Sequence, residues 1–198
     1  MSTYTNPSIN TGATVPIGLD AAIESIRSGI AGIAWVSKSF GRAWAVKEKD
    51  PVSERILTIP KCYTAEGDYQ NVLPNDTLFT GTTAASSFIA VIGEESYESF
   101  QPHTGSVKKA DLAVIVWANL KMIDSSKTYI FNEQLKKDLE AVLKVNSMVS
   151  SINSWVEEKA EKVFEGYDFT GDQFLTEYLM YPYWGCRVEL TVVYDESC

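Results

Sequence analysis

The sequence predicts an α+β fold, with a mixed, largely antiparallel sheet flanked by helices, an extended N-terminal arm and a long loop. Short runs rich in β-branched and aromatic residues recur between residues 34 and 119, as is typical of strands. Apolar residues after residue 124 follow helical spacing, and the C-terminal residues alternate between apolar and polar. Because 45% of the 198 residues are hydrophobic, the chain can build a core. We expect one α+β domain over residues 19–198.

The first segment, residues 1–18, is rich in Ser, Thr, Asn, Pro and Gly, and its apolar residues have no period. It is predicted to be an extended arm, either disordered alone or ordered by lying on a neighbouring subunit. From Leu19 onward the spacing predicts an amphipathic helix that ends near Gly29 or Gly32. Its apolar positions are Leu19, Ala22, Ile23, Ile26 and Ile30.

Strands and a long loop are predicted next. Residues 34–50 carry aromatic and β-branched residues around Gly41, which predicts strands that turn near this glycine. Another strand follows over residues 54–64, and Pro60 is expected to end it or to place it at a sheet edge. Residues 64–84 are punctuated irregularly by Gly, Pro, Asn and Asp, which predicts a loop long enough to have a contact role.

Three further runs also predict strands. Residues 86–93 and 111–120 are short apolar runs rich in Ile and Val, so both faces of these strands are expected to be largely covered. Residues 186–194 alternate, and this pattern requires a sheet partner. One face of that last strand has Cys186, Val188, Leu190, Val192 and Tyr194, and the other has Arg187, Glu189 and Thr191.

Helices are predicted after Asp124. Asn132 is a plausible N-cap for the first of them, and Ser154 with Glu157 has the spacing of a capping box for the second. A short third helix is expected over residues 172–181, before Pro182. The apolar stripe of the first helix is Leu135, Leu139, Val142 and Leu143, and that of the second is Val156, Ala160, Val163 and Phe164.

The composition excludes several classes of protein. Seventeen Lys and Arg against 26 Asp and Glu give a formal charge of −9, which disfavours a DNA or RNA reader but suits a wall past which DNA slides. The three cysteines, Cys62, Cys186 and Cys198, have no spacing typical of a disulfide framework or a zinc site, so reduced thiols in the cytoplasm are expected. With neither a signal-peptide pattern nor an apolar run of roughly 20 residues, a soluble protein without membrane contact is expected.

The sequence contains no strong catalytic or metal-binding motif. Asp168 and Asp172 resemble half of a calcium loop, but the closing Glu is missing and a turn is favoured, so no metal or cofactor is expected. Catalysis by a Ser/His/Asp or Cys/His pair would have to use His103, and no nucleophile motif accompanies it. The tryptophans have two interpretations: core and subunit-interface residues, or sugar-stacking platforms such as Trp44 and Trp184.

Two stretches resemble a known family of phage proteins. The stretch "IPKCYTAEGDYQNVLPND" and the stretch "SFIAVIGEESYESF" are similar to those of neck and head-to-tail connector proteins of tailed bacteriophages, including the crAss-like group. The resemblance implies a tail-terminator-like α+β fold and a ring of identical subunits between portal and tail. It also implies acidic surfaces that tolerate DNA passage, and arms or loops exchanged between neighbouring subunits.

From these observations we expect a noncatalytic structural virion protein that forms a homo-oligomeric ring in the phage neck or tail junction and lines the DNA passage. Its expected partners are other copies of itself and other neck, portal or tail proteins, together with passing DNA, without sequence-specific binding. One alternative is a carbohydrate-binding or adhesion module that uses surface aromatics, and another is an enzyme that relies on His103. The predicted subunit-interface residues are Tyr4, Tyr69, Leu73, Phe79, Tyr183 and Trp184.

Overall fold

The computed structural model describes most of the chain outside the first residues. The described residues are 16–50, 54–63, 69–73, 84–100, 106–157, 160–168 and 181–195. The predicted interface residues Tyr4 and Phe79, the histidine His103 and the helix expected over 172–181 lie outside these ranges, except for Tyr181.

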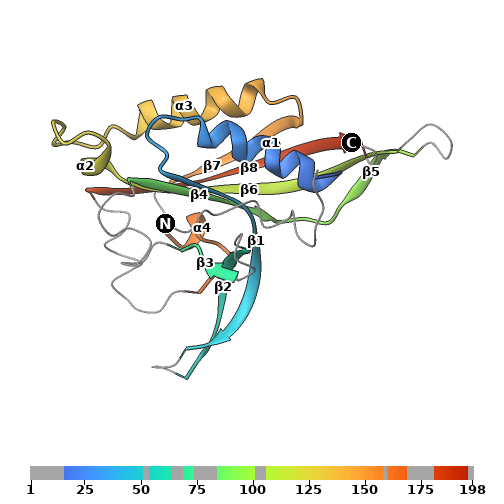
Figure 1. Cartoon of the computed structure of the whole chain (residues 1–198), viewed down its shortest axis with the longest axis horizontal. Coiled ribbons are helices and arrows are strands. Elements are labelled where there is room, and N and C mark those ends of the chain that lie inside the picture. The colour runs from blue at the N-terminus through green and yellow to red at the C-terminus, as the bar shows by residue number, and fades with distance from the viewer. Residues whose placement is uncertain are drawn as a thin grey trace.

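Eight strands form one mixed sheet (Figure 1). Their order is β3-β2-β1-β4-β6-β8-β7, and β5 pairs with β6 beside this path. Strands β1 and β4 are parallel, whereas every other pair is antiparallel, so the predicted α+β fold with a largely antiparallel sheet is confirmed. The strands are β1 Lys38–Lys49, β2 Ile56–Tyr63, β3 Tyr69–Asn71, β4 Ala85–Val91, β5 Ser96–Ser99, β6 Val107–Asn119, β7 Val149–Val156 and β8 Tyr183–Asp195.

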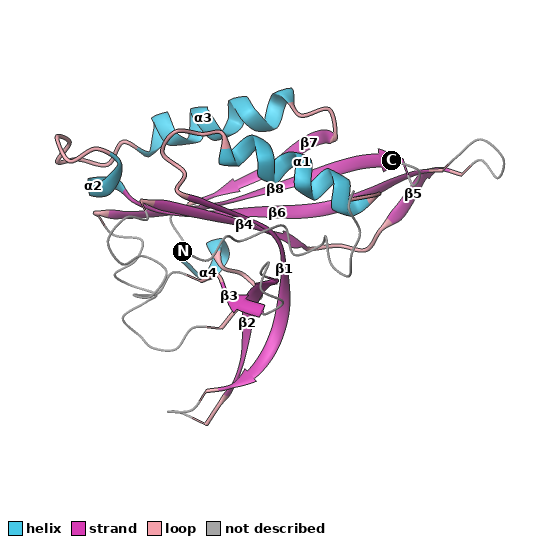
Figure 2. Ribbon diagram, in the orientation of Figure 1, coloured by secondary structure: helices cyan, strands magenta, loops and turns pink. Residues whose placement is uncertain are grey.

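Four helices lie in the described part of the chain, on both faces of the sheet (Figure 2). Helices α1 and α3 lie side by side on one face, which we call the helix face, and α4 lies on the opposite face (Figure 1). The predicted first helix is confirmed, since α1 buries all five apolar residues that the spacing selects. The predicted stripe on α3 is also confirmed, with Leu135, Leu139 and Leu143 buried and Val142 partly buried. The helices are α1 Leu19–Ala31, α2 Leu120–Ile123, α3 Asn132–Val145 and α4 Ala160–Val163.

The long strands β6 and β8 form the centre of the sheet and are paired over 13 positions. Alternation along β8 sends Val188 and Leu190 to the helix face, where both are fully buried. On β6 the neighbouring residues Val114 and Ile115 enter the cores on opposite faces of the sheet. Each buried side chain of this size contributes about 1.5–3 kcal/mol to folding. The expectation that the strands within residues 86–93 and 111–120 are largely covered on both faces is confirmed, because β4 and the second half of β6 are buried almost throughout.

Strand β1 leaves the sheet with a long bend and carries β2 and β3 away from its plane (Figure 1). The prediction of a turn near Gly41 is wrong, since β1 is continuous and Gly41 lies where the register with β4 shifts. A glycine inside a strand favours such an irregularity without ending the strand. Pro60 does not end β2 either; its carbonyl accepts from Val72 N at 3.1 Å, so its nitrogen faces the side that the short strand β3 covers.

Two helix-capping predictions are wrong. The N-cap position of α3 is Phe131, and the amide of Asn132 instead donates to Glu157 Oε1 at 3.2 Å. Ser154 lies in β7 and donates to Glu189 Oε2 at 3.2 Å, so it does not start a helix. Pairing of β7 with β8 outweighs the local capping pattern in this segment. The segment predicted as a long loop also contains a strand, β3.

Candidate functional site

Arg187 is the only charged residue that is buried in the described part of the chain, with 4% of its surface exposed. It lies on β8 between Cys186 and Val188, which point to the helix face. The alternation of the strand therefore turns Arg187 toward the opposite face. Burying a charge costs free energy unless partners compensate it, so its surroundings decide what this position does.

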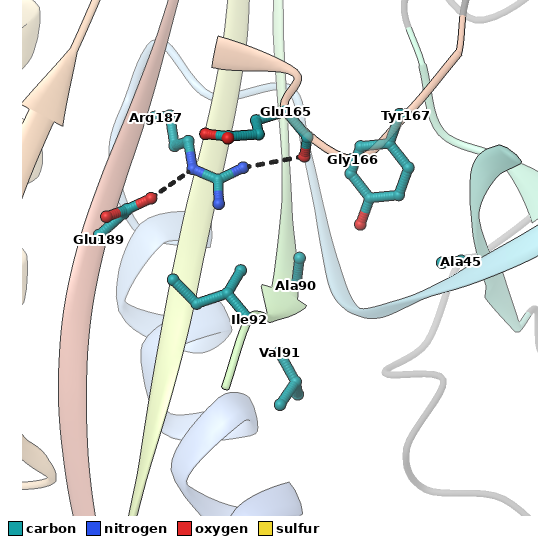
Figure 3. Close-up of a pocket in the computed structure, with 9 residues that line it drawn as sticks. All are labelled: Ala45, Ala90, Val91, Ile92, Glu165, Gly166, Tyr167, Arg187 and Glu189. Carbon is teal, nitrogen blue, oxygen red and sulfur yellow. Dashed lines mark hydrogen bonds and ion pairs between the residues drawn. The ribbon is translucent and has the colours of Figure 1, made fainter. Parts of the chain in front are cut away.

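The guanidinium of Arg187 has partners on only two of its three nitrogens among the described residues (Figure 3). Its Nε donates to Glu189 Oε1 at 2.9 Å, and its Nη1 donates to the carbonyl of Glu165 at 3.2 Å. Within the described ranges Nη2 has no acceptor, and in Figure 3 it points toward Ile92. The arrangement thus leaves hydrogen-bond donors directed into the space beside β4.

That space is a cavity of about 470 Å³, which we call the Arg187 pocket. Strands β1, β4 and β8 and the segment that follows α4 contribute its walls. One side is polar and the other is formed by small apolar side chains, a combination typical of ligand sites. The residues around the pocket are Ala45, Ala90, Val91, Ile92, Glu165, Gly166, Tyr167, Arg187 and Glu189.

The wall after α4 is held in place by contacts with β2. The backbone of Asp168 donates to the carbonyl of Thr58 at 2.7 Å, and its carboxylate accepts from Thr58 N at 2.8 Å. Asp168 therefore acts here as a clamp between segments. Gly166 has φ +92°, a conformation that L residues rarely adopt, and it precedes Tyr167 in the wall. The ring of Tyr167 packs edge-on against Phe88, with 5.9 Å between the centroids.

The net charge of the side chains around the pocket is neutral or slightly negative. Burial raises the pKa of Tyr167 to about 12, so its hydroxyl stays protonated at neutral pH. Glu189 and Glu165 both lie beside the single guanidinium. The hydrogen bond from Lys162 lowers the pKa of Glu165, which keeps this carboxyl ionised. The pocket thus offers donors and acceptors together.

The two described cysteines are poorly suited to nucleophilic chemistry. Cys62 and Cys186 are free and fully buried, and burial raises the pKa of each thiol. The thiolate is the reactive form of cysteine, so a raised pKa suppresses this reactivity. Their apolar surroundings instead assign both side chains to packing.

Three of the predicted interface residues have most of their contacts within the chain. Tyr183 stacks on Trp117 at 5.1 Å between centroids, and Trp184 is 5% exposed and donates from Nε1 to Glu157 Oε1 at 3.0 Å. Leu73 is 4% exposed and belongs to the core on the face opposite the helices. Tyr69, in contrast, is 49% exposed on β3, and no described contact joins it to the others.

The burial of Trp184 also bears on the alternative function, a carbohydrate-binding module that uses surface aromatics. Trp184 packs edge-on against Trp35 with 6.4 Å between centroids, so its ring offers no platform to a sugar. Trp44 is 38% exposed, but the guanidinium of Arg42 lies 4.0 Å from its ring centroid. One face of the Trp44 ring is therefore already occupied by a cation.

Two exposed apolar clusters were not predicted from the sequence. The first, which we call the β5 end, consists of Tyr97 and Phe100, with 52% and 66% of their surfaces exposed. Their rings pack edge-on, with 5.4 Å between centroids, and Lys108 Nζ lies 5.2 Å from the Tyr97 ring centroid. The flanking stretch of residues 92–100 has three glutamates and no basic residue.

The second group, which we call the α2 end, consists of the exposed residues Met122, Tyr129 and Ile130 on and after α2, with 39%, 61% and 53% of their surfaces exposed. It belongs to residues 120–131, which contain two lysines and one aspartate. In Figure 1 the α2 end and the β5 end lie at opposite ends of the sheet's long direction. The pairing agrees, since Tyr97 pairs with Lys108 near the start of β6, whereas α2 begins directly after β6.

The length of β6 separates the two ends. Its 13 residues span about 40 Å at the usual rise of a strand. The clusters therefore cannot form one continuous patch on a single copy. Their exposure could not be predicted from the sequence, because an apolar or aromatic residue in a strand or loop is the same residue type whether it is buried or exposed.

Candidate metal sites, membrane-spanning helices and related proteins give no further indication of function. In the part of the chain that the structure describes, no group of three His, Cys, Asp or Glu side chains is placed to hold a metal ion. No described helix is long and apolar enough to cross a bilayer. Comparison with models of known protein families and with curated proteins finds no match.

Proposed function

We propose that this chain is a noncatalytic structural protein of a tailed-phage virion that assembles into a homo-oligomeric ring in the neck or tail junction. The observation that carries the proposal is the placement of two unlike apolar clusters, the β5 end and the α2 end, at opposite ends of one long sheet. A contact between unlike patches of identical subunits is heterologous, and it repeats from copy to copy until the rotation closes a ring.

The charges of the two ends favour such a contact. Three glutamates in residues 92–100 surround the β5 end, and Lys108 and Lys109 on β6 face only part of this charge. Residues 120–131 have one more lysine than aspartate, so the α2 end is weakly positive. Opposite charges around two apolar patches steer encounter and fix orientation, while the buried apolar area supplies most of the affinity.

The overall charge suits the inner wall of a DNA passage. A formal charge of −9 repels phosphate groups, so DNA slides past without the counterion release that causes nonspecific binding. The likeness of two sequence stretches to phage neck proteins supports the placement in a virion. Partners in that setting are neighbouring copies and other portal, neck or tail proteins.

A complementation experiment tests head-to-tail assembly. One variant carries Tyr97→Ser and Phe100→Ser at the β5 end, and the other carries Tyr129→Ser and Ile130→Ser at the α2 end. Each variant alone retains only one competent end, so native mass spectrometry is expected to show a monomer. An equimolar mixture has one intact pair of ends, so it is expected to form a dimer and nothing larger.

The matched control is Val145→Ser, because Val145 is 83% exposed on α3 and belongs to neither end. It is expected to assemble like the unmodified chain. A ring visible by cryo-electron microscopy, alone or with portal or tail proteins, is the positive outcome for the full chain. A chain that stays monomeric at high concentration and binds neither portal nor tail proteins would contradict the proposal. A mixture of the two variants without dimers would contradict the head-to-tail arrangement.

A further inference from the structure

We propose that the Arg187 pocket binds an uncharged amide group, in a ligand whose remaining part is apolar. The amide belongs either to the side chain of Asn or Gln or to a peptide backbone. This inference concerns the face of the sheet opposite the helices and uses neither the β5 end nor the α2 end. It therefore stands or falls independently of ring assembly.

The first step concerns the guanidinium donors that have no acceptor among the described residues. Arg187 has five N–H donors, and two of them have acceptors among the described residues, Glu189 Oε1 and the Glu165 carbonyl. The Nη2 donors face the pocket, where Arg187 is only 4% exposed to water. A buried donor without a partner costs more free energy than the average hydrogen bond gains. An acceptor that enters the pocket removes this cost.

The second step is the sign of the charge that the pocket accepts. Glu189 and Glu165 stand beside one guanidinium, and Lys162 pairs with Glu165, so the group as a whole has no excess of positive charge for a phosphate or carboxylate. An anion here would gain the attraction of Arg187 and also meet the repulsion of the Glu189 carboxylate, which has no lysine partner among the described residues. An uncharged acceptor gains the hydrogen bond from Arg187 without charge repulsion from the carboxylates.

The third step is the match between an amide and the polar wall. An amide carbonyl accepts from Arg187 Nη2 or from the Tyr167 hydroxyl, which has no partner among the described residues. An amide N–H donates to a carboxylate oxygen of Glu189, which also accepts from Arg187 and Ser154. Carbonyl and N–H are adjacent in an amide, as the donor Arg187 and the acceptor Glu189 are on the pocket wall.

The last step is the shape of the opposite wall. Ala45, Ala90 and Ile92 are small or medium apolar side chains that contact the aliphatic part of a ligand. The cavity of about 470 Å³ lies in the range of small-ligand and short-peptide sites. A free-standing water molecule satisfies the donors but leaves this apolar wall hydrated, so an amide with an apolar part is the better occupant.

The test compares three blocked tripeptides, acetyl-Gly-X-Gly-amide with Asn, Asp or Leu at X, on the full chain. Saturation-transfer difference NMR measures each dissociation constant, and it works for weak ligands of large assemblies. Asn and Asp have nearly the same shape and differ in charge, so we expect the Asn peptide to bind about tenfold more tightly than the Asp peptide. A Leu peptide that binds like the Asn peptide assigns the pocket to backbone amide, and a weaker Leu peptide assigns it to side-chain amide.

Variants connect the binding to the pocket. Arg187→Met removes the donors and is expected to abolish binding, with circular dichroism to check folding. Tyr167→Phe removes only a hydroxyl and is expected to weaken the Asn peptide about three- to tenfold. Tyr69→Phe is the matched control, since Tyr69 is exposed on β3 and does not line the pocket, and it is expected to leave binding unchanged.

Three results would overturn the inference. An Asp peptide that binds as tightly as the Asn peptide would identify an anion site. No saturation transfer from any peptide at millimolar concentration would leave water as the occupant of the pocket. Binding that survives both Tyr167→Phe and a folded Arg187→Met variant would place the amide site elsewhere.

Discussion

The two faces of the central sheet are built from the same strands but bury different chemistry. On the helix face, β8 contributes Cys186, Val188 and Leu190, which pack against α1 and α3 in a wholly apolar cluster. On the opposite face a neighbouring residue of the same strand is Arg187, which is buried beside the half-exposed Glu189 and a cavity. One residue of register therefore separates a dry core from a polar pocket.

This difference indicates how stability and binding are divided. Apolar packing on the helix face gains free energy with every side chain that is covered. The opposite face keeps a buried cation whose donors are not all used in the described structure, which by itself lowers stability. A chain that only needed to fold would be served as well by an apolar residue at position 187. The pocket is therefore the part of the sheet in which a binding role is to be sought.

The sharpest test of this division is a pair of truncations, one on each face. Leu139→Ala empties a fully buried position of α3, and it is expected to lower the free energy of unfolding by about 2–5 kcal/mol. Ile92→Ala removes a pocket side chain that is 41% exposed, and it is expected to cost less than about 1 kcal/mol. Urea unfolding at one protein concentration measures both values.

Equal losses for the two variants would contradict the comparison. In that case the pocket wall would be as much a part of the folding core as the helix face. A second readout separates the roles, because Ile92→Ala is expected to weaken the amide peptide while Leu139→Ala leaves its affinity unchanged when folded. The two faces would then differ in function as well as in stability.

The next test uses pH to measure how dry the pocket wall is. Burial raises the pKa of Tyr167 from 10.0 to about 12, which means that the folded chain holds this proton more tightly than the unfolded chain does. Below pH 10 both states are protonated and Tyr167 adds no pH dependence. Above it the unfolded state ionises first, so the free energy of unfolding falls, by about 2–3 kcal/mol once both states have ionised.

The comparison that isolates this effect is a series of unfolding curves between neutral pH and pH 12 for the unmodified chain and Tyr167→Phe. The variant is expected to lose less stability over the alkaline range, because it has no hydroxyl to ionise. Other groups titrate there too, so the difference between the two curves, and not the loss in either one, isolates Tyr167. Identical curves for the unmodified chain and Tyr167→Phe would mean that the ring is hydrated, which would also weaken the amide proposal.

The fold could be predicted from the sequence wherever burial alone sets a period. The stripe from Leu19 to Ile30 and the alternation from Cys186 to Tyr194 both reached their predicted faces, because each element packs one side against the core. Ser154 and Gly41 misled for a different reason. Their local patterns are typical of a cap and a turn, but the strands β8 and β4 that pair with these segments are distant in sequence.

The candidate site could not be predicted in the same way. Alternation placed Arg187 on the polar side of the last strand together with Glu189 and Thr191, but it did not indicate that this side is covered at Arg187. Its burial depends on Glu165 and Tyr167, which follow α4, and on residues of β1 and β4. No local sequence pattern indicates that residues distant in the chain pack over this side of β8. Likewise Phe100 and Trp184 are both aromatic, and only the structure shows that Phe100 is 66% exposed and Trp184 5%.

The smallest expected effect concerns how the helix face is closed, at the crossing of α1 and α3. A Cβ atom added to Gly29 would lie 2.7 Å from Cγ1 of Val142, closer than side chains approach. Alanine is a better helix former than glycine by about 0.5–1 kcal/mol, but forcing a methyl group into a packed contact costs about 1–3 kcal/mol. Because Val142 is β-branched and its χ1 is restricted in a helix, we expect Gly29→Ala to lose about 1 kcal/mol overall.

A double-mutant cycle with Val142→Ala decides between packing and propensity at this crossing. In the Val142→Ala background the added methyl group has room, so Gly29→Ala is expected to become neutral or stabilising. The resulting coupling between the two positions, measured by urea unfolding, should then be about 1–2 kcal/mol. If Gly29→Ala stabilises the unmodified chain by itself, the side chain of Val142 moves aside at little cost in free energy. The helix face would then share the tolerance that we assign to the pocket face, and the contrast between the two faces would lie in their polarity alone.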